Sequence, residues 1–227
     1  MARRSLMQHL ARWHIWLGWV VAIPLVLWTL SGLVMALRPI EQVRGEDLRG
    51  ERHALSEEQR FKVPEVNGWP VIKMTLIQRV DGPVWIIERA DHSLLTSKAQ
   101  TGEQIQGVDA PLARRIADDA LKSPARKALV RRFDADRSPI DLRRARPAWQ
   151  VHYEDGTNVY VDADTGEVLA LRTRWWRFYD FMWGLHIMDP VERENSSHPL
   201  LIGMAALGLL STAMGSALLL RRRTAVR

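Results

Sequence analysis

Residues 13–37 read WHIWLGWVVAIPLVLWTLSGLVMAL, a stretch without Asp, Glu, Lys or Arg. A second stretch without these residues covers 199–220 near the other end of the chain. As a helix, each is long enough to cross a hydrocarbon core of ~30 Å, which takes about 20 residues. The sequence therefore predicts two transmembrane helices, one near each end of the chain, with the largest segment of the chain between them.

Arginines flank both stretches on the side of the chain termini. They are Arg3, Arg4 and Arg12 before the first stretch, and Arg221, Arg222, Arg223 and Arg227 after the second. Positively charged flanks stay in the cytoplasm, so both termini are expected inside and the middle of the chain outside. The predicted location is the bacterial cytoplasmic (inner) membrane, with the first helix as an uncleaved signal-anchor because its apolar run exceeds that of a signal peptide.

The expected order is a cytoplasmic basic tail (1–12), a transmembrane helix (13–37), a periplasmic domain (38–173), an aromatic interfacial helix (174–189), a transmembrane helix (199–220) and a basic tail (221–227).

Net charge and cysteine content exclude several classes of protein. The whole chain carries +6, and the two tails hold seven arginines and no acidic residue, which leaves −1 (6 − 7) for the rest. The excess of basic residues therefore lies in the flanks of the two spans, where it indicates membrane orientation, and we expect no nucleic-acid partner. The chain has no cysteine, so disulfides, thiolate metal ligands and covalent haem attachment are excluded, and any haem would be held non-covalently.

The middle of the chain contains an internal repeat with an offset of 64 residues. Trp85 matches Trp149, Asp91 matches Asp155, and the triplet Thr-Gly-Glu at 101–103 recurs at 165–167. Such a fixed offset indicates two copies of one supersecondary unit, at about 64–105 and 109–172.

Each copy is predicted to contain antiparallel strands. In the second copy, Trp149–Tyr153 and Thr157–Asp162 flank Asp155-Gly156, a strong hairpin signal. Between the copies, Asp109-Ala110-Pro111 opens a helix with an apolar stripe, which needs a sheet to cover. The predicted fold class is a membrane-anchored α+β protein, in which two transmembrane helices flank an extracytoplasmic domain of two repeats.

Several of these segments resemble a known family. The segment 147–171, which contains NVYVDADTGEVL at 158–169, is similar to the second half of a PepSY domain, and ARRIA at 113–117 is similar to its first half. His14-x-Trp16-x-Gly18 and Leu185-His186 resemble the PepSY-associated transmembrane family. The two PepSY-like repeats are part of what this resemblance implies.

The resemblance implies a function, because larger relatives with four or more spans include haem-containing reductases of ferric siderophores. By this reading the chain is a haem b protein that moves electrons outward for iron reduction. The alternative is a non-enzymatic PepSY binding module that docks or restrains an envelope partner such as a peptidase. The residues leave open whether the chain is an enzyme.

Histidines near the membrane are the candidate cofactor and metal ligands. His14 lies inside the first apolar stretch, where an imidazole is either a functional group such as an axial haem ligand or a member of an aromatic belt with Trp13, Trp16 and Trp19. We expect it to bind haem iron, and the alternative stays open.

His186 is the second candidate and belongs to the aromatic segment 175–188. On a helix, Trp176, Tyr179, Trp183 and His186 fall within a sector of ~80°. Trp183 and His186 could form one wall of a haem pocket, or the segment could be an interfacial helix. His198, directly before the second span, is a third candidate ligand.

Topology restricts how these histidines combine. His14 is expected at the inner end of its span and His186 and His198 at the outer end, about 30 Å apart, so His14 and His186 cannot share one iron. A bis-histidine site would pair His186 with His198, His14 with His9, or one histidine with its copy in a second subunit. The expected partners are therefore membrane lipid, a homodimer formed through the spans, and an envelope protein or ferric siderophore.

Overall fold

A computed structural model describes residues 2–51, 53–56, 58–66, 68 and 70–225. The chain divides into two compact units. One, here called the helical unit, comprises Met1–Pro39 and Phe178–Arg227, and the other, the sheet domain, comprises Ile40–Arg177.

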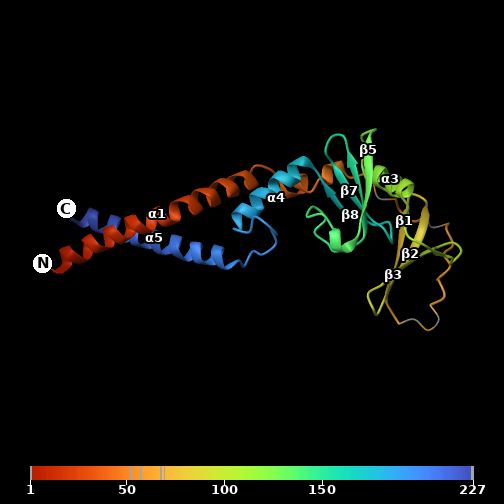
Figure 1. Ribbon diagram of the computed structural model, residues 1–227, viewed down its shortest axis with the longest axis horizontal. Coiled ribbons are helices and arrows are strands. Elements are labelled where there is room, and N and C mark those ends of the chain that lie inside the picture. The colour runs from red at the N-terminus through yellow and green to blue at the C-terminus, as the bar shows by residue number, and fades with distance from the viewer. Residues whose placement is uncertain (1, 52, 57, 67, 69, 226–227) are drawn as a thin grey trace. The chain divides into compact units, whose positions relative to one another are not determined.

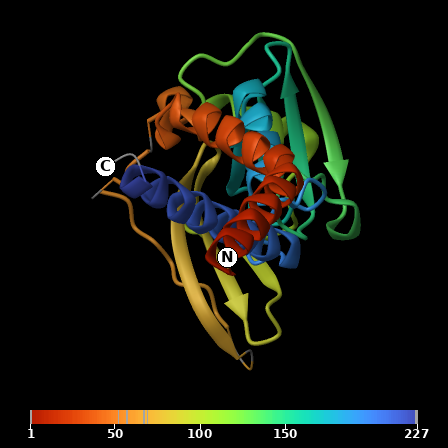
Figure 2. The same ribbon diagram turned by 90° about the vertical axis from the view of Figure 1, so that its left-hand side faces the viewer.

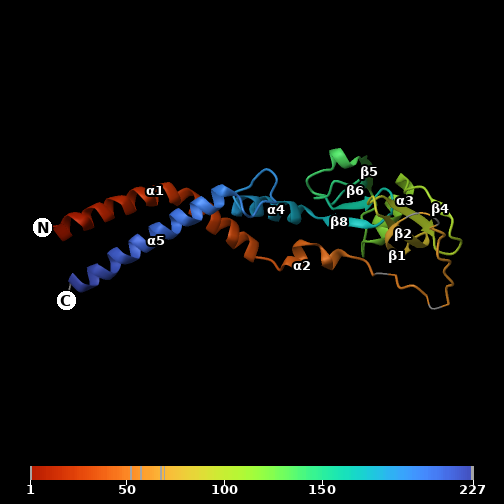
Figure 3. The same ribbon diagram turned by 90° about the horizontal axis from the view of Figure 1, so that it is seen from below.

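Two long helices form most of the helical unit. They are α1 (Ala2–Ala36) and α5 (Pro199–Ala225), and α1 begins at the end of the pair where α5 finishes (Figures 1, 2 and 3). Within them, Met7–Ala36 and Pro199–Leu220 are long and apolar enough to span a membrane. Most of their apolar side chains, such as Trp19 and Leu209, are exposed within this chain, as expected for surfaces that face lipid.

Both helices extend past the apolar stretches into the arginine-bearing tails. Helix α1 begins at Ala2, so the described residues of the predicted basic tail 1–12 are helical and continue directly into the apolar stretch. Nothing in this segment interrupts a helix, because it contains neither Pro nor Gly and is rich in Leu, Ala and Arg.

A third helix, α4 (Arg174–His186), begins in the sheet domain and ends in the helical unit. Its C-terminus is a Schellman motif, in which Met188 adopts a left-handed conformation with φ 57°. The N–H of Met188 donates to the carbonyl of Leu185 at 3.2 Å, and that of Asp189 to the carbonyl of Gly184 at 2.9 Å. His186 is therefore the last helical residue, on a backbone that a defined cap holds in place.

The sheet domain contains two four-stranded antiparallel sheets, each with its strands in chain order. The first consists of β1 (Val71–Arg79), β2 (Gly82–Arg89), β3 (Leu94–Lys98) and β4 (Gln104–Ile105). The second consists of β5 (Ala128–Phe133), β6 (Ala148–Tyr153), β7 (Asn158–Asp162) and β8 (Val168–Arg172). The short helices are α2 (Ile40–Val43), η1 (Glu46–Leu48) and η2 (Ala135–Arg137), and α3 (Ala110–Asp119) lies between the sheets in sequence.

The repeat is confirmed at the level of the backbone. Gly102 and Gly166 follow equivalent strands with φ 78° and 75°. The N–H of Gly102 donates to the carbonyl of Lys98 at 2.8 Å, and that of Gly166 to the carbonyl of Asp162 at 3.0 Å. The two copies thus share one strand–turn–strand unit, here called repeat 1 (β1–β4) and repeat 2 (α3 with β5–β8).

Helix α3 covers one face of the second sheet. Asp109 caps its N-terminus by accepting the N–H of Leu112 at 2.9 Å, as the sequence predicts for Asp-Ala-Pro. Ala113, Ile116 and Ala117 are buried on this sheet, together with strand residues Val151, Tyr153, Val159, Val161 and Leu171. Ala113 and Ala117 are small, so α3 approaches the second sheet closely. The larger hydrophobic core of the domain lies between this helix and that sheet. The predicted fold class, a membrane-anchored α+β chain, is confirmed.

Candidate functional site

His186 is held against α1 by two oxygen atoms. Its Nδ1 lies 3.1 Å from Oγ of Ser31 and 3.2 Å from the carbonyl oxygen of Trp28. The hydroxyl of Ser31, which is almost completely buried, donates its own proton to the same Trp28 carbonyl at 3.0 Å. One ring nitrogen of His186 is thus fixed to α1.

These contacts favour one position for the proton in a neutral His186 imidazole. A carbonyl oxygen only accepts hydrogen bonds, and the Ser31 proton is already directed to Trp28. The tautomer with Nδ1–H donating to the Trp28 carbonyl satisfies both contacts and leaves a lone pair on Nε2. Histidines that bind metals usually donate their second N–H to a carbonyl or carboxylate in this way.

The His186 ring lies over a glycine and beside an indole. A Cβ placed on Gly32 would come within 3.2 Å of Cε1 of His186, so any larger residue at position 32 would press on the ring. The Trp28 ring lies with its centroid 5.4 Å from that of His186, at an interplanar angle of 33°. An oxygen, a glycine and an aromatic ring of α1 together determine the position of the imidazole.

His14 has a related environment against α5. Its Nδ1 lies 3.5 Å from Oγ of Ser211, and a Cβ on Gly215 would come within 2.9 Å of its Cε1. The serine hydroxyl can donate or accept, so the direction of this hydrogen bond is set by the tautomer. Each of the two histidines thus lies against a serine and a glycine of a neighbouring helix.

The two imidazoles lie at different levels of the helical unit. His14 and Ser31, the contact of His186, are 17 residues apart on α1, about 26 Å at 1.5 Å per residue. One metal ion cannot bind both. His9 and His14 differ by five positions on the same helix, which places them about 140° apart around its axis, so they do not converge either.

The other two predicted site residues have hydrogen bonds of their own. Nδ1 of His198 accepts the N–H of Leu200 at 3.3 Å, at the start of α5. The indole N–H of Trp183 donates to the carbonyl of Arg193 at 3.1 Å and ties the segment after α4 back to that helix. Asp180 and Arg193 form an ion pair in the same place at 2.9 Å. Their predicted role in cofactor binding stays a prediction.

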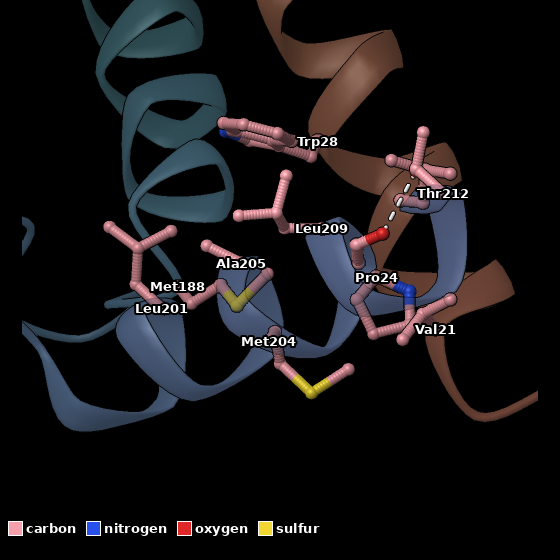
Figure 4. Close-up of a pocket in the computed structure, with 11 residues that line it drawn as sticks. Val21, Pro24, Trp28, Met188, Leu201, Met204, Ala205, Leu209 and Thr212 are labelled. Atoms are coloured by element: carbon pink, nitrogen blue, oxygen red, sulfur yellow. Dashed lines mark hydrogen bonds between the residues drawn. The ribbon is translucent and has the colours of Figure 1, made fainter. Parts of the chain in front are cut away.

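An apolar cavity of about 280 Å³ lies between α1 and α5 (Figure 4). Its lining includes Pro24 and Trp28 of α1, Met204 and Gly208 of α5, and Met188 after α4. The cavity occupies the stretch of the helix pair between the level of His14 and that of His186. Trp28 belongs both to its wall and to the surroundings of His186.

The donor set is suited to the axial ligation of haem. The described residues contain no group of three or more His, Cys, Asp or Glu side chains that could hold a metal by themselves. Haem supplies four nitrogens of its own and needs only axial ligands, for which a neutral imidazole is suited. His186 offers its Nε2, with the tautomer fixed by Trp28 and Ser31, in apolar surroundings.

Sequence reasoning identified the histidines and missed most of their contacts. Ser31, Trp28, Ser211 and Gly215 were not identified as contacts of the histidines. A serine or glycine inside a long apolar stretch was the available signal, because a hydroxyl in hydrocarbon needs a partner.

Comparison with known protein families gives one match. The family model described as "PepSY-associated TM region" matches residues 11–226, nearly the whole chain. Neither the curated proteins nor the solved structures give a match.

Proposed function

We propose that this chain, which belongs to the PepSY-associated TM region family, is a haem b protein that carries electrons across the cytoplasmic membrane toward ferric iron on the outer side. One observation carries the proposal. Nδ1 of His186 donates to the carbonyl of Trp28 and leaves Nε2 available as a ligand, within a membrane unit rather than at the surface of a soluble domain.

The residues of the chain hold and orient the ligands. When bound, haem would supply a reversible one-electron couple between ferric and ferrous iron. Ser31 and Trp28 would keep the His186 ring in one orientation, and Gly32 would leave room for it. Apolar side chains around the imidazoles would exclude water, and this exclusion, with axial ligation, influences the reduction potential.

A second copy of the chain would supply the second axial ligand. Among the described residues, the neighbours that hold His14 and His186 are a serine, a glycine and a carbonyl, with no second imidazole, whereas haem b in electron transfer commonly has two axial ligands. Cβ atoms on Gly18 and Gly203 would meet no described atom within 4 Å, so the backbones there are open to a neighbouring helix. A homodimer would pair each histidine with its own counterpart in a bundle of four helices.

The direction of electron flow follows from the proposed topology. By the positive-inside rule, the arginines of both tails support termini in the cytoplasm and a sheet domain in the periplasm. His14 is then the inner site and His186 the outer one, so electrons would enter from a membrane or cytoplasmic donor and leave toward ferric iron. A ferric siderophore is the substrate that the family resemblance suggests.

The visible spectrum of protein purified in mild detergent from haem-replete cells tests the proposal. We expect a Soret band and reducible α and β bands of low-spin haem in the wild type. His186→Ala should convert the outer haem to high spin or release it. Gly32→Val keeps the imidazole but crowds its ring, and should perturb the same bands.

His92→Ala is the matched control, because His92 lies in the turn between β2 and β3 and contacts Glu88 at 3.3 Å. It should leave the spectrum unchanged. A colourless wild-type preparation, or unaltered spectra in both the His14→Ala and the His186→Ala variants, contradicts the proposal.

A further inference from the structure

The cavity between α1 and α5 is open toward the outside of the helical unit. Of its lining side chains, Trp28 is 40% exposed within the chain, Leu25 49% and Leu209 74%. A Cβ on Gly208, which also lines the cavity, would meet no described atom within 4 Å. Both helices are long and apolar enough to span a membrane, so this space opens into hydrocarbon rather than water. A molecule dissolved in the membrane therefore has access to it.

A threonine hydroxyl gives the wall of this cavity a hydrogen-bond acceptor. Thr212 lines the cavity, and its Oγ1 donates to the carbonyl of Gly208 at 2.9 Å (Figure 4). Because the only proton of the hydroxyl is used in this way, the hydroxyl can offer only lone pairs to an occupant. The matching occupant therefore carries a donor such as O–H, which the acyl chain of a lipid lacks.

Pro24 adds a second acceptor to the same wall. It lines the cavity and has no N–H, so the carbonyl of Val20 lacks the donor that α1 would otherwise give it. Residues four apart lie on the same face of a helix, which places this carbonyl on the cavity side of α1. Hydrocarbon contains no water that could replace the missing donor. A second donor on the occupant is matched here.

The remaining lining is suited to a flat ring. The indole of Trp28 presents an aromatic surface, and the thioethers of Met188 and Met204 are flexible and make favourable contacts with aromatic rings. The cavity volume is about 280 Å³. Since an apolar cavity of about 150 Å³ binds benzene, this one has room for a substituted ring.

The cavity also adjoins the surroundings of both candidate histidines. At one end, the Trp28 ring lies with its centroid 5.4 Å from that of His186. At the other end, Thr212 directly follows Ser211, whose Oγ lies 3.5 Å from Nδ1 of His14. A ligand in the cavity is thus placed between the two positions that the proposed function assigns to haem.

We propose that this cavity binds the ring of an isoprenoid quinol, a hydroquinone that carries a long apolar tail. Its phenolic hydroxyls donate to Thr212 and to the carbonyl of Val20, and its ring contacts Trp28. The tail follows the exposed side chains of Leu25 and Leu209 into the lipid. The choice of a quinol among phenols with apolar tails rests on the proposed function, which needs a reductant that is soluble in the membrane. Binding itself requires no haem.

Calorimetric titration of decylubiquinol into the full-length chain in detergent, under anaerobic conditions, tests the site. We expect saturable binding once the heat of partition into empty micelles is subtracted. Gly208→Phe directs a ring into the cavity from a Cβ that has free space, and should abolish binding. Gly203→Phe is the matched control, because a Cβ there is equally free while Gly203 lies outside the lining, and it should bind as the wild type does.

Two comparisons test the hydrogen bonds. Thr212→Val keeps the shape of the side chain and removes the hydroxyl, so the quinol should bind about 2- to 10-fold more weakly. Thr29→Val is the matched control, because Thr29 donates to the carbonyl of Leu25 at 2.8 Å in the same way but lies outside the lining. The dimethyl ether of the quinol has no donor. It should bind the wild type more weakly than the quinol does, and Thr212→Val should not weaken it further.

Absence of saturable binding to the wild type overturns the proposal. Equal binding of the quinol and its dimethyl ether would also overturn it, because the cavity would then be an apolar groove for lipid tails. Full binding by Gly208→Phe would place the quinol elsewhere, with the same consequence. A preparation without haem that binds the quinol contradicts the proposed function and leaves this site standing, whereas a preparation with haem that fails to bind it has the opposite meaning.

Discussion

The pair Gly102 and Gly166 allows the cost of a backbone conformation to be separated from the cost of crowding. Both residues are left-handed, with φ 78° and 75°, at equivalent turns. A Cβ at Gly166 would come within 2.9 Å of Cδ of Arg79 and 3.1 Å of Cδ1 of Ile116. A Cβ at Gly102 would meet nothing closer than Cδ of Lys62 at 3.6 Å, an ordinary contact.

Alanine at either position should destabilise its turn, by different amounts. The left-handed conformation costs a residue with a Cβ about 1–2 kcal/mol, and this cost is common to both. Gly166→Ala adds about 1–3 kcal/mol of overpacking, because Arg79 is buried and donates to the carbonyl of Thr165 at 3.1 Å and to Asp81 at 2.6 Å. We therefore expect about 1–2 kcal/mol for Gly102→Ala and at least about 2 kcal/mol for Gly166→Ala.

Hydrogen exchange of the full chain in detergent measures both effects locally. At 1.36 kcal/mol per tenfold change, protection of β3 and β4 should fall about 5- to 30-fold in Gly102→Ala. Protection of β7 and β8 should fall by about 30-fold or more in Gly166→Ala. Equal losses in the two variants would refute the role given to Arg79, and no loss in either would refute the left-handed turn itself.

Two further predictions concern topology and pH. A reporter that is active only outside the cytoplasm should work when inserted near Gly107 and fail at Arg227, and the reverse pattern would contradict the positive-inside assignment. The hydrogen bond from His53 to Asp119 at 2.8 Å, together with the carboxylate charge, raises the pKa of His53 above 6.5. Its stabilisation is therefore fully present below that value and is lost as the pH rises through the raised pKa. An NMR titration should show this pKa, and Asp119→Asn should lower it; an unchanged pKa in that variant would refute the assignment.

The repeat was predictable from sequence only where both copies keep the same spacing. Downstream of Trp85 and Trp149 the offset is constant, and the strands and turns there match the predicted hairpins. Upstream the offset breaks, because β1 joins β2 through a tight turn whereas residues 134–147 separate β5 from β6. Strands β1 and β5 were therefore missed: alignment by one fixed offset does not superpose them.

The candidate site was predictable to the level of residue type and no further. His14 and His186 stood out because ionisable side chains are rare in apolar or aromatic surroundings. Their contacts depend on the register between α1 and α5 and on the cap that ends α4 at His186. The register and the cap are tertiary features, which a local sequence pattern does not specify. Ser31-Gly32, for example, is compatible with any helix interface in a membrane.

Differences between the two copies are more informative about function than their shared residues. The Thr-Gly-Glu turns are retained because the backbone turn needs a left-handed glycine, and the same conformation and hydrogen bonds occur in both repeats. Where the backbones coincide and the side chains differ, as at Arg89 against Tyr153 and Ser97 against Val161, the local fold does not demand the change. Val161 and Tyr153 lie on the face of the second sheet that α3 covers. Among the described residues of 62–70 no helix leads into β1, so the packing against α3 that selects Val161 and Tyr153 in repeat 2 does not act on Ser97 and Arg89 in repeat 1.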